Sequence, residues 1–236
     1  ATLPGTAAEI LDDEIRKIIC PDKLNTGQWL EVLETAHLQG LKTTSTIMYG
    51  HVEGYEHWAR HLNRVRTLQE KTGGITEFVP LPFVASEAPL YLKGKARKGP
   101  TYREAVLMHA VARLALHGQI DNIQTSWVKM GAAGAKQCLN AGVNDLGGSL
   151  MNESITRAAG ALHGQEMPPS KMEAAITEIG RNARQRNTVY GTVTQERLTT
   201  SHNASELTDI ANTPARKYER AKSGKKVDLI KLKTTA

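Results

Sequence analysis

The feature that most constrains how this chain of 236 residues can fold is a repeated order of strand-like and helix-like segments. Residues Lys42–Tyr49 are rich in β-branched side chains, which favours a β-strand. Residues Tyr55–Lys71 then place apolar side chains on one helical face, and the pair Gly73-Gly74 is typical of a helix end. The same order recurs, with strands predicted at 75–79, 121–128 and 142–146 and helices from Thr101, up to Asn140 and from Ser170.

Strands that alternate with helices predict parallel βαβ units and therefore an α/β fold. Four such units suit half of a (β/α)8 barrel or, alternatively, an open doubly wound sheet. The chain has no G-x-G-x-x-G after a strand and no G-x-x-x-x-G-K-[ST], which disfavours a nucleotide-binding open sheet. A long loop that contains Pro80 and Pro82 is expected after the second strand. We therefore predict half of a barrel, built from four βα units.

The first residues predict an abrupt beginning. Residues Thr2–Ala8 are typical of a loop that enters a helix at about Ala8, with Glu9 in its first turn and no strand before it. Four strands of a barrel cannot close on themselves, and the first of them exposes an unpaired edge. We therefore expect a fragment, or a chain that needs a complementary half.

The net charge of +6 is concentrated in one segment. Residues 216–233 carry eight basic and two acidic side chains, so the rest of the chain is balanced. A solvated basic tail is favoured over a nucleic-acid interface, which makes nucleic acid an unlikely partner. No apolar run reaches the ~18 residues of a membrane span, and no signal peptide opens the chain, so we expect a cytoplasmic protein with no membrane partner.

Two cysteines, Cys20 and Cys138, are the only thiols and lie far apart. They form no CxxC or longer ligand cluster, so we expect two reduced, buried thiols and no metal ligands within this chain.

Polar residues gather where three of the predicted strands end. The first strand continues into 50–53, the third ends near 126–129, and the fourth ends at 144–148. Parallel barrels build their active sites at the carboxyl ends of the strands. His51 beside Glu53 is compatible with an acid/base pair, a ligand pair or a solvated loop. Asn144 and Asp145 suit either a polar substrate or simple turn chemistry, and Trp127 is more typical of a core than of a stacking platform.

Several long segments also resemble a known family. These are LPGTAAEILDDEIR, GLKTTSTIMYGHVEGYEHWARHL, TEFVPLPFV, QTSWVKMG and NDLGGSLMNESITRAAGALHGQ, at 3–16, 40–62, 76–84, 124–131 and 144–165. They look like the radical S-adenosylmethionine (SAM) enzymes of the FO synthase and futalosine-pathway group. The segments ASEAPLYL and LGGSLMNESITRAAGA are most similar to FO synthase subunit 2, the 5-amino-6-(D-ribitylamino)uracil–L-tyrosine 4-hydroxyphenyl transferase, or to the second half of the fused form.

The resemblance implies the C-terminal half of a radical-SAM TIM-type barrel. The segment RQRNTVYG at 184–191 resembles the end of the family's barrel domain. We therefore divide the chain into a partial barrel, 1–191, and a polar, basic and flexible tail, 192–236.

The resemblance also implies an activity. In the family a [4Fe-4S] cluster binds S-adenosyl-L-methionine and cleaves it to a 5′-deoxyadenosyl radical, while the protein orients the reactants. The radical acts on L-tyrosine, whose 4-hydroxybenzyl group joins 5-amino-6-(D-ribitylamino)uracil on the way to the deazaflavin FO, with the companion FO synthase subunit as a partner. The family's CxxxCxxC motif does not occur here, so the cluster ligands lie outside this chain, and we expect the chain alone to be inactive.

Site residues follow from the same resemblance. The segment TIMYGHVE resembles the G-x-I-x-G-x-x-E pattern that contacts the adenosyl part of SAM; Gly50 and Glu53 match it, whereas Thr46 and Met48 depart from it. Thr6 and Glu9 are expected to touch SAM as well. His51 is the catalytic candidate and faces the substrate region, and Ser126, Asn144 and Asp145 are expected to hold the polar substrates.

Two alternatives remain open at this point. One is aminofutalosine synthase or dehypoxanthine futalosine cyclase, which belong to the same group. The other is a non-catalytic half-barrel that uses its basic tail to bind a partner.

Overall fold

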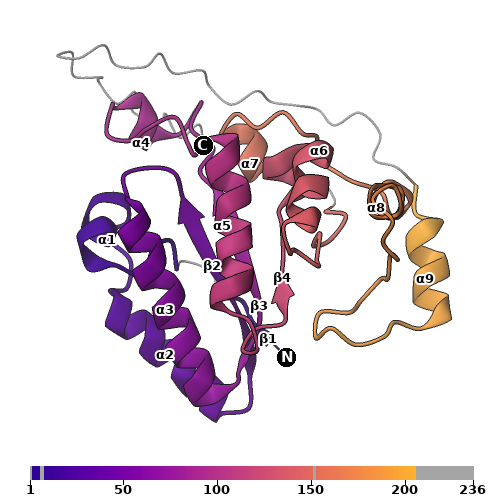
Figure 1. Cartoon of the computed structure of the whole chain (residues 1–236), viewed down its shortest axis with the longest axis horizontal. Helices are drawn as coiled ribbons and strands as arrows, with labels where there is room; N and C mark the ends of the chain where they lie inside the picture. Colours follow the sequence, from indigo (N-terminus) through magenta and orange to yellow (C-terminus); the bar gives the residue numbers. More distant parts are fainter. Residues whose placement is uncertain (1, 6–7, 151–152, 206–236) are drawn as a thin grey trace, which may run out of the picture.

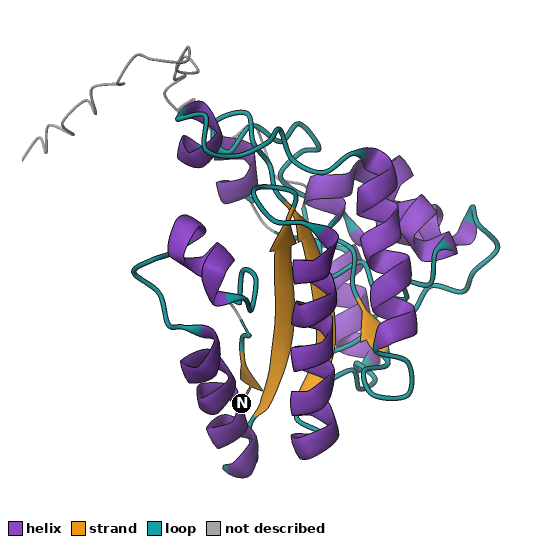
Figure 2. Ribbon diagram, turned by 60° about the vertical axis from the view of Figure 1, so that its left-hand side comes forward, coloured by secondary structure: helices purple, strands orange, loops and turns teal. Residues whose placement is uncertain are grey.

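The computed structural model describes residues 2–5, 8–150 and 153–205, and it has an α/β fold (Figure 1). Its sheet has four parallel strands in the order β1-β2-β3-β4. The two long central strands lie side by side between two short ones (Figure 2). The strands are β1 (Thr2–Leu3), β2 (Lys42–Tyr49), β3 (Ile75–Pro82) and β4 (Asn122–Ile123). The α/β prediction and the parallel sheet are therefore confirmed.

The helices of the described residues alternate with these strands or follow them. They are α1 (Asp13–Ile19), α2 (Thr26–Leu38), α3 (Tyr55–Thr72), α4 (Pro89–Leu92), α5 (Tyr102–Ala115), α6 (Trp127–Asn140), α7 (Ile155–Ala158), α8 (Pro169–Thr177) and α9 (Gln195–His202). Local chemistry explains their ends. Capping boxes begin α2 at Asn25 and α5 at Thr101, and Gly73 ends α3 in the left-handed conformation with φ 61°.

One face of the sheet carries the hydrophobic core. Along β2, Ile47 and Tyr49 are fully buried and pack with residues of α2, α3, α5 and α6. The side chains at alternate positions of β2, Thr44, Thr46 and Met48, point to the opposite face and are only half-buried. One face of this parallel sheet is therefore covered by helices, while the other is partly open among the described residues.

Strand β3 is longer than predicted, because it runs through both prolines. Its ladder with β2 continues to Tyr49↔Pro82. The Phe83 amide donates to the Tyr49 carbonyl at 2.8 Å, so the backbone N–H groups of the odd-numbered residues point toward β2. The backbone nitrogens of Pro80 and Pro82 therefore point toward the side of β4. The pairing of β3 with β4 ends at Phe78↔Ile123, before the first proline. A strand tolerates proline where no partner needs its N–H, which is why the loop prediction at residue 80 was wrong.

The sheet begins and ends differently from the prediction. Residues Thr2–Leu3, predicted as a loop, form β1 in register with Lys42–Thr43. Residues 142–146 make only the isolated parallel bridge Gln124↔Asp145, and the predicted strand 121–128 shortens to β4 because α6 begins at Trp127. Glu9 has a positive φ of 45° and precedes α1 rather than lying in a first helical turn.

The described chain continues past residue 191 as α9. Its His202 Nε2 lies 2.9 Å from Glu173 Oε1 of α8, and the Ser201 hydroxyl donates to Gln185 Oε1. The division at residue 191 stays a prediction, and the whole basic segment, 216–233, falls outside the described residues. None of the helices in the described ranges is long and apolar enough to cross a membrane.

Candidate functional site

The carboxyl end of β2 turns sharply around one buried carboxylate, that of Glu53. Its side chain is 0% exposed. It accepts hydrogen bonds from the backbone amides of Gly50, His51 (2.9 Å) and Val52 (3.0 Å), and from the Trp58 indole N–H of α3 at 2.9 Å. Three successive amides thus point at one carboxylate, which fixes the path of the chain beyond the strand.

These donors decide the charge of Glu53. Burial alone would raise the pKa of the carboxyl, but hydrogen bonds from His51, the Gly50 amide and Trp58 hold that pKa far below its ordinary value. The guanidinium of Arg97 adds a positive charge 4.0 Å away. Glu53 is therefore ionised at neutral pH, and the protein occupies its lone pairs.

His51 is buried against this carboxylate rather than exposed in a loop. Its Nε2 lies 3.0 Å from the Met48 carbonyl and donates to it, because a carbonyl offers no proton. Its Nδ1 lies 2.9 Å from Glu53 Oε2 and 2.8 Å from the Val52 amide. A proton on Nδ1 is donated to Glu53, and without that proton Nδ1 accepts from Val52. The ring meets Phe83, at the end of β3, edge to face at 5.8 Å.

Gly50 is required by its backbone and by its neighbour. It has φ 93°, and a Cβ at this position would lie 2.2 Å from Pro100 Cδ and 2.4 Å from Pro100 N. A larger residue would displace the loop that enters α5 or open the turn that holds Glu53. Gly50, His51 and Glu53, all predicted from the sequence, therefore form one compact unit.

The predicted residues at the end of β4 are engaged by the protein in different ways. Asn144 Oδ1 accepts from the Ile123 amide at 2.9 Å and from Arg113 at 2.8 Å. Asp145 is buried, accepts from the Gly147 amide at 2.6 Å, and pairs with Arg186 at 2.5 Å. Both side chains thus hold the segments around β4 in place.

Ser126 differs from these two residues. It is the N-terminal residue that caps α6, is half-buried, and has no side-chain capping bond. Within the described parts of the chain no partner hydrogen bonds to its hydroxyl. Of the two residues expected to touch SAM from the beginning of the chain, Glu9 forms an ion pair with Lys23 at 2.7 Å, and Thr6 lies outside the described residues.

A second buried carboxylate cluster was not predicted. Glu77 of β3 accepts from the Tyr190 hydroxyl at 2.5 Å and lies 3.4 Å from Arg186, which also holds Asp145. The Arg186 guanidinium stacks over the Tyr190 ring at 4.1 Å. Burial raises the pKa of Glu77, although Tyr190 and Arg186 act in the opposite direction. The carboxylates of Asp145 and Glu77 lie 41 to 113 positions from their partners Arg186 and Tyr190, so no local pattern could have joined them.

The segment 153–167 covers the carboxyl ends of β3 and β4. The Glu87 amide, after β3, donates to the Ala159 carbonyl at 3.0 Å, and the Glu153 amide donates to Gln165 at 2.9 Å. A Cβ on Gly131 of α6 would lie 2.8 Å from the His163 ring. Helices α4 and α7 lie at this upper end of the sheet, toward which the strands point (Figure 1).

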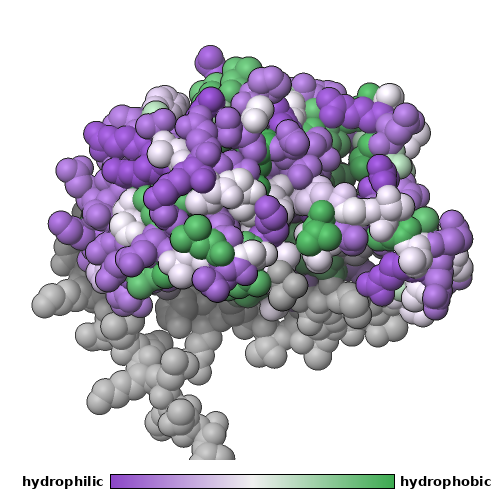
Figure 3. Space-filling view, turned by 90° about the horizontal axis from the view of Figure 1, so that it is seen from below, coloured by the Kyte–Doolittle hydropathy of each residue, from purple (hydrophilic) through white to green (hydrophobic). Residues whose placement is uncertain are grey.

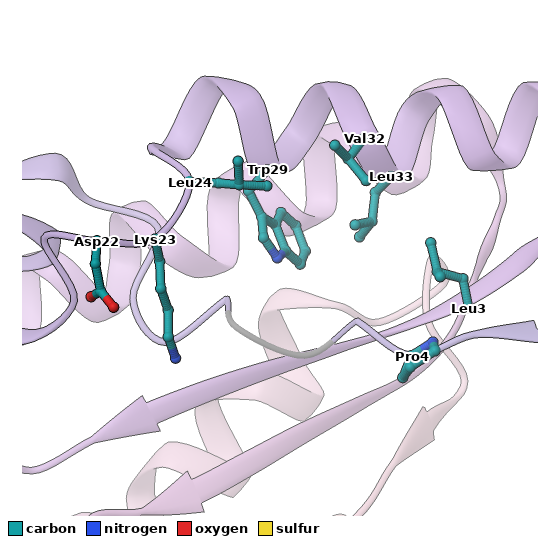
Figure 4. A pocket seen from close by; sticks show the side chains of 8 residues that line it. All are labelled: Leu3, Pro4, Asp22, Lys23, Leu24, Trp29, Val32 and Leu33. Carbon is teal, nitrogen blue, oxygen red and sulfur yellow. The ribbon is translucent and has the colours of Figure 1, made fainter.

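A hollow lined by described residues lies elsewhere. It measures about 420 Å³ and is lined by Leu3, Pro4, Asp22, Lys23, Leu24, Trp29, Val32 and Leu33. Its apolar wall comes from α2 and faces β1 (Figure 4). The lower face of the molecule shows hydrophobic residues only in small separate patches among hydrophilic ones (Figure 3). The candidate site is thus the polar rim at the strand ends and not this hollow.

Comparison with known proteins gives consistent matches. The family described as the CofH/MqnC C-terminal region matches residues 72–198. FO synthase of Nocardia farcinica is 55% identical over 192 residues, which cover 81% of this chain and 22% of that protein. FO synthase of Mycobacterium leprae is 54% identical over 189 residues, with 80% and 22% covered.

A third relative is shorter. The 5-amino-6-(D-ribitylamino)uracil–L-tyrosine 4-hydroxyphenyl transferase of Methanothermobacter thermautotrophicus is 50% identical over 189 residues, which cover 80% of this chain and 52% of that protein. The chain thus spans about half the length of this transferase and about a fifth of the FO synthases.

Proposed function

Because this chain belongs to the family of CofH/MqnC C-terminal regions, we propose that it works as part of a radical SAM transferase. The reaction joins the 4-hydroxybenzyl group of L-tyrosine to 5-amino-6-(D-ribitylamino)uracil in the synthesis of the deazaflavin FO. The observation that carries this proposal is the 50% identity to the archaeal transferase over 80% of the chain. The companion FO synthase subunit is the proposed partner, and the cytoplasm the proposed location.

The sheet supports a half-barrel in this role. Its strands follow one another in chain order without reversal, as in a (β/α) barrel, whereas a doubly wound sheet changes direction at a switch point. Helices cover the face with Ile47 and Tyr49, and the half-buried face with Thr46 and Met48 becomes the interior of the closed barrel. No described strand pairs with the outer edge of β1, where further strands would continue the sheet.

The turn after β2 fits the proposed role in SAM binding. Gly50 and Glu53 fix a rigid loop whose backbone lies at the strand ends, where barrel enzymes bind their ligands. Since the Glu53 carboxylate is saturated by protein donors, its proposed task is to hold this loop against the adenosyl group. Thr6 and Glu9 remain proposed SAM contacts.

The described residues do not fit the [4Fe-4S] cluster. The cluster needs three thiolates and one open iron, and the chain has two separate buried cysteines. One grouping of potential ligands occurs among the described residues, Asp12, Glu14 and His57, and it contains no sulfur. We therefore place the cluster ligands outside this chain.

The other predicted site residues are proposed to bind a substrate, to position the backbone or to hold a proton. Ser126 offers a polar substrate a hydroxyl that has no hydrogen bond among the described residues, whereas Asn144 holds the Ile123 amide before it and Asp145 holds the turn at Gly147. His51 holds a proton on Nε2 and shares Nδ1 between Glu53 and Val52, so its proposed part is to keep the loop closed around its ligands. The protein thus supplies orientation and exclusion of water.

The test is an anaerobic assay of the complete protein with SAM, reductant, L-tyrosine and the aminouracil. We expect 5′-deoxyadenosine and the coupled product by mass spectrometry, and no coupled product without tyrosine. Turnover of a futalosine-type substrate without turnover of tyrosine would contradict the proposal and favour aminofutalosine synthase or dehypoxanthine futalosine cyclase. No turnover of either would favour a non-catalytic role.

A further inference from the structure

The first turn of α6 presents two polar groups without partners on the same side. Ser126 is the N-cap of α6 and Lys129 is the third residue of the helix, the two positions whose side chains lie together in a capping box. Lys129 is half-buried, and across residues 2–5, 8–150 and 153–205 its ammonium group has no hydrogen bond and no ion pair. By contrast, Lys136 of the same helix pairs with Glu178 at 2.6 Å.

A half-buried ammonium group without a counter-ion is unusual. Removing a charge from water costs free energy unless a partner of opposite charge replaces the water. Burial accordingly lowers the pKa of Lys129, although Glu153 and Glu9 act in the opposite direction. Glu9 is already paired with Lys23, so it does not serve as the partner of Lys129.

Glu153 supplies the complementary charge on the other side of the rim. Its Oε1 accepts from the Thr156 amide at 2.9 Å, while its Oε2 is buried and has no partner in the described structure. A buried carboxylate oxygen without a donor calls for an explanation. Lys129 and Glu153 influence each other electrostatically but do not form an ion pair within 4.0 Å.

Both residues lie at the strand ends that form the candidate site. Lys129 lies in the first turn of α6, the helix that follows β4, and Trp127 ties this turn to the Gly148 carbonyl at 2.9 Å. Glu153 belongs to the segment that contacts the loop after β3 through Ala159 and Glu87. Gly131 breaks α6 at φ 67°, ψ 173°, so the helical part before it is a single turn. A ligand at this place would be bound by the side chains and not by the helix dipole.

We propose that Lys129 and Ser126 bind the α-carboxylate of an amino-acid group and that Glu153 accepts its α-ammonium group. A zwitterion placed here would satisfy the uncompensated ammonium, the free hydroxyl and the orphaned carboxylate oxygen together. This inference rests on the proposed function, which offers two ligands with such a group: L-tyrosine and the methionyl end of SAM. It places the amino-acid group of one of these ligands at Lys129, Ser126 and Glu153, and none of the three is a cluster ligand.

Binding to the unreduced holoenzyme tests the proposal without turnover. Calorimetric titration would compare L-tyrosine with tyramine, which lacks the carboxylate, and SAM with 5′-methylthioadenosine, which lacks the amino-acid group. We expect Lys129→Met to weaken one carboxylate ligand roughly 10- to 100-fold, the size of a lost charge-assisted hydrogen bond, and to leave its truncated analogue unchanged. Glu153→Gln should weaken the same ligand roughly tenfold.

The controls separate this subsite from the fold and from the proposed function. Lys136→Met removes a lysine of the same helix and should leave all four affinities unchanged. If Lys129→Met does not fold, the conservative Ser126→Ala variant should still weaken the carboxylate ligand and not its analogue.

A selective loss for tyrosine or for SAM supports the subsite and identifies its source. Unchanged affinities for both, in variants that fold, overturn the subsite while the proposed function stands. A wild-type holoenzyme that binds neither ligand overturns both.

Discussion

Glu53 and Asp145 are both buried carboxylates near the ends of parallel strands, but their partners come from different distances along the chain. Glu53 is held by residues within five positions, from Gly50 to Trp58. Asp145 is held by Arg186, 41 positions away, which also contacts Glu77. The first cluster is a local turn that forms with the strand, and the second closes only when the end of the described chain returns to the sheet.

This difference has an energetic side. The Glu53 side chain is fully buried and accepts from four N–H donors, three of them backbone amides, while His51 Nδ1 lies 2.9 Å from its Oε2. Arg186 keeps 26% of its side chain exposed, so solvent screens its two ion pairs. We therefore expect the local turn to be rigid and costly to disturb, and the long-range cluster to be weaker and more easily opened.

The largest effect should come from Glu53→Gln. An amide would place an N–H against backbone N–H donors in a site without water, and we expect a loss of about 3–5 kcal/mol in the free energy of unfolding. Urea denaturation of wild type and variant measures it. The matched control is Glu56→Gln, because Glu56 is 61% exposed and its loss should change stability by less than about 0.5 kcal/mol. Similar values for the two variants would contradict the contrast.

Gly50→Ala should come next. The alanine would face a positive φ of 93° and contact Pro100, and we expect a loss of about 2–4 kcal/mol. Gly40→Ala separates the two causes, since Gly40 has φ 77° with no atom within 4 Å of the added Cβ. It should cost only about 1 kcal/mol. Thermal and urea unfolding of both variants would show whether the Pro100 contact matters.

Arg186→Met tests the long-range cluster. The loss should be about 1–3 kcal/mol, because Asp145 and Glu77 lose a partly exposed partner. Arg184→Met, which removes an exposed arginine bonded to Thr192, should change stability by less than about 0.5 kcal/mol. In a double-mutant cycle, Arg186→Met and Asp145→Asn should be less than additive. Full additivity would show that the two side chains do not stabilise each other.

The smallest effect should be on the pH dependence of the free energy of unfolding, to which Glu53 and Glu77 should contribute with opposite signs. The pKa of Glu53 is lowered in the fold, so its contribution is present above the ordinary value of 4.5 and is lost as the pH falls below it. The pKa of Glu77 is raised, so its contribution is present below 4.5 and is lost as the pH rises. Unfolding between pH 3 and pH 7 should therefore give Glu53→Gln and Glu77→Gln opposite changes in slope relative to wild type. Equal signs would contradict the assignment of burial as the main influence on Glu77.

The parts of the fold predicted well are those with local causes. Strand β2 has the predicted bounds, and α3 differs by one residue at its end, because alternation, helical periodicity and a glycine cap are visible in short windows. Strand β1 was missed because two residues carry no pattern and their partners lie 40 positions away. The predicted strand at 142–146 reduces to one bridge, because Asn144 and Asp145 form the turn that simple turn chemistry also allowed, with the Gly147 amide donating to Asp145.

The candidate site divides in the same way. Gly50, His51 and Glu53 were predicted from one motif and lie in one turn. Arg97 and Lys129 carry no local signal, because only the packing of distant loops gives them their surroundings.

Pro80 and Pro82 set a boundary inside the sheet. They allow the outer half of β3 to be paired with β2 but give a neighbour on the other side no N–H to bond. The chain after Ile123 therefore leaves the sheet beside the part of β3 that is still paired with β2. Changes in the 124–150 region can therefore be accommodated without altering the ladder that carries the Glu53 turn.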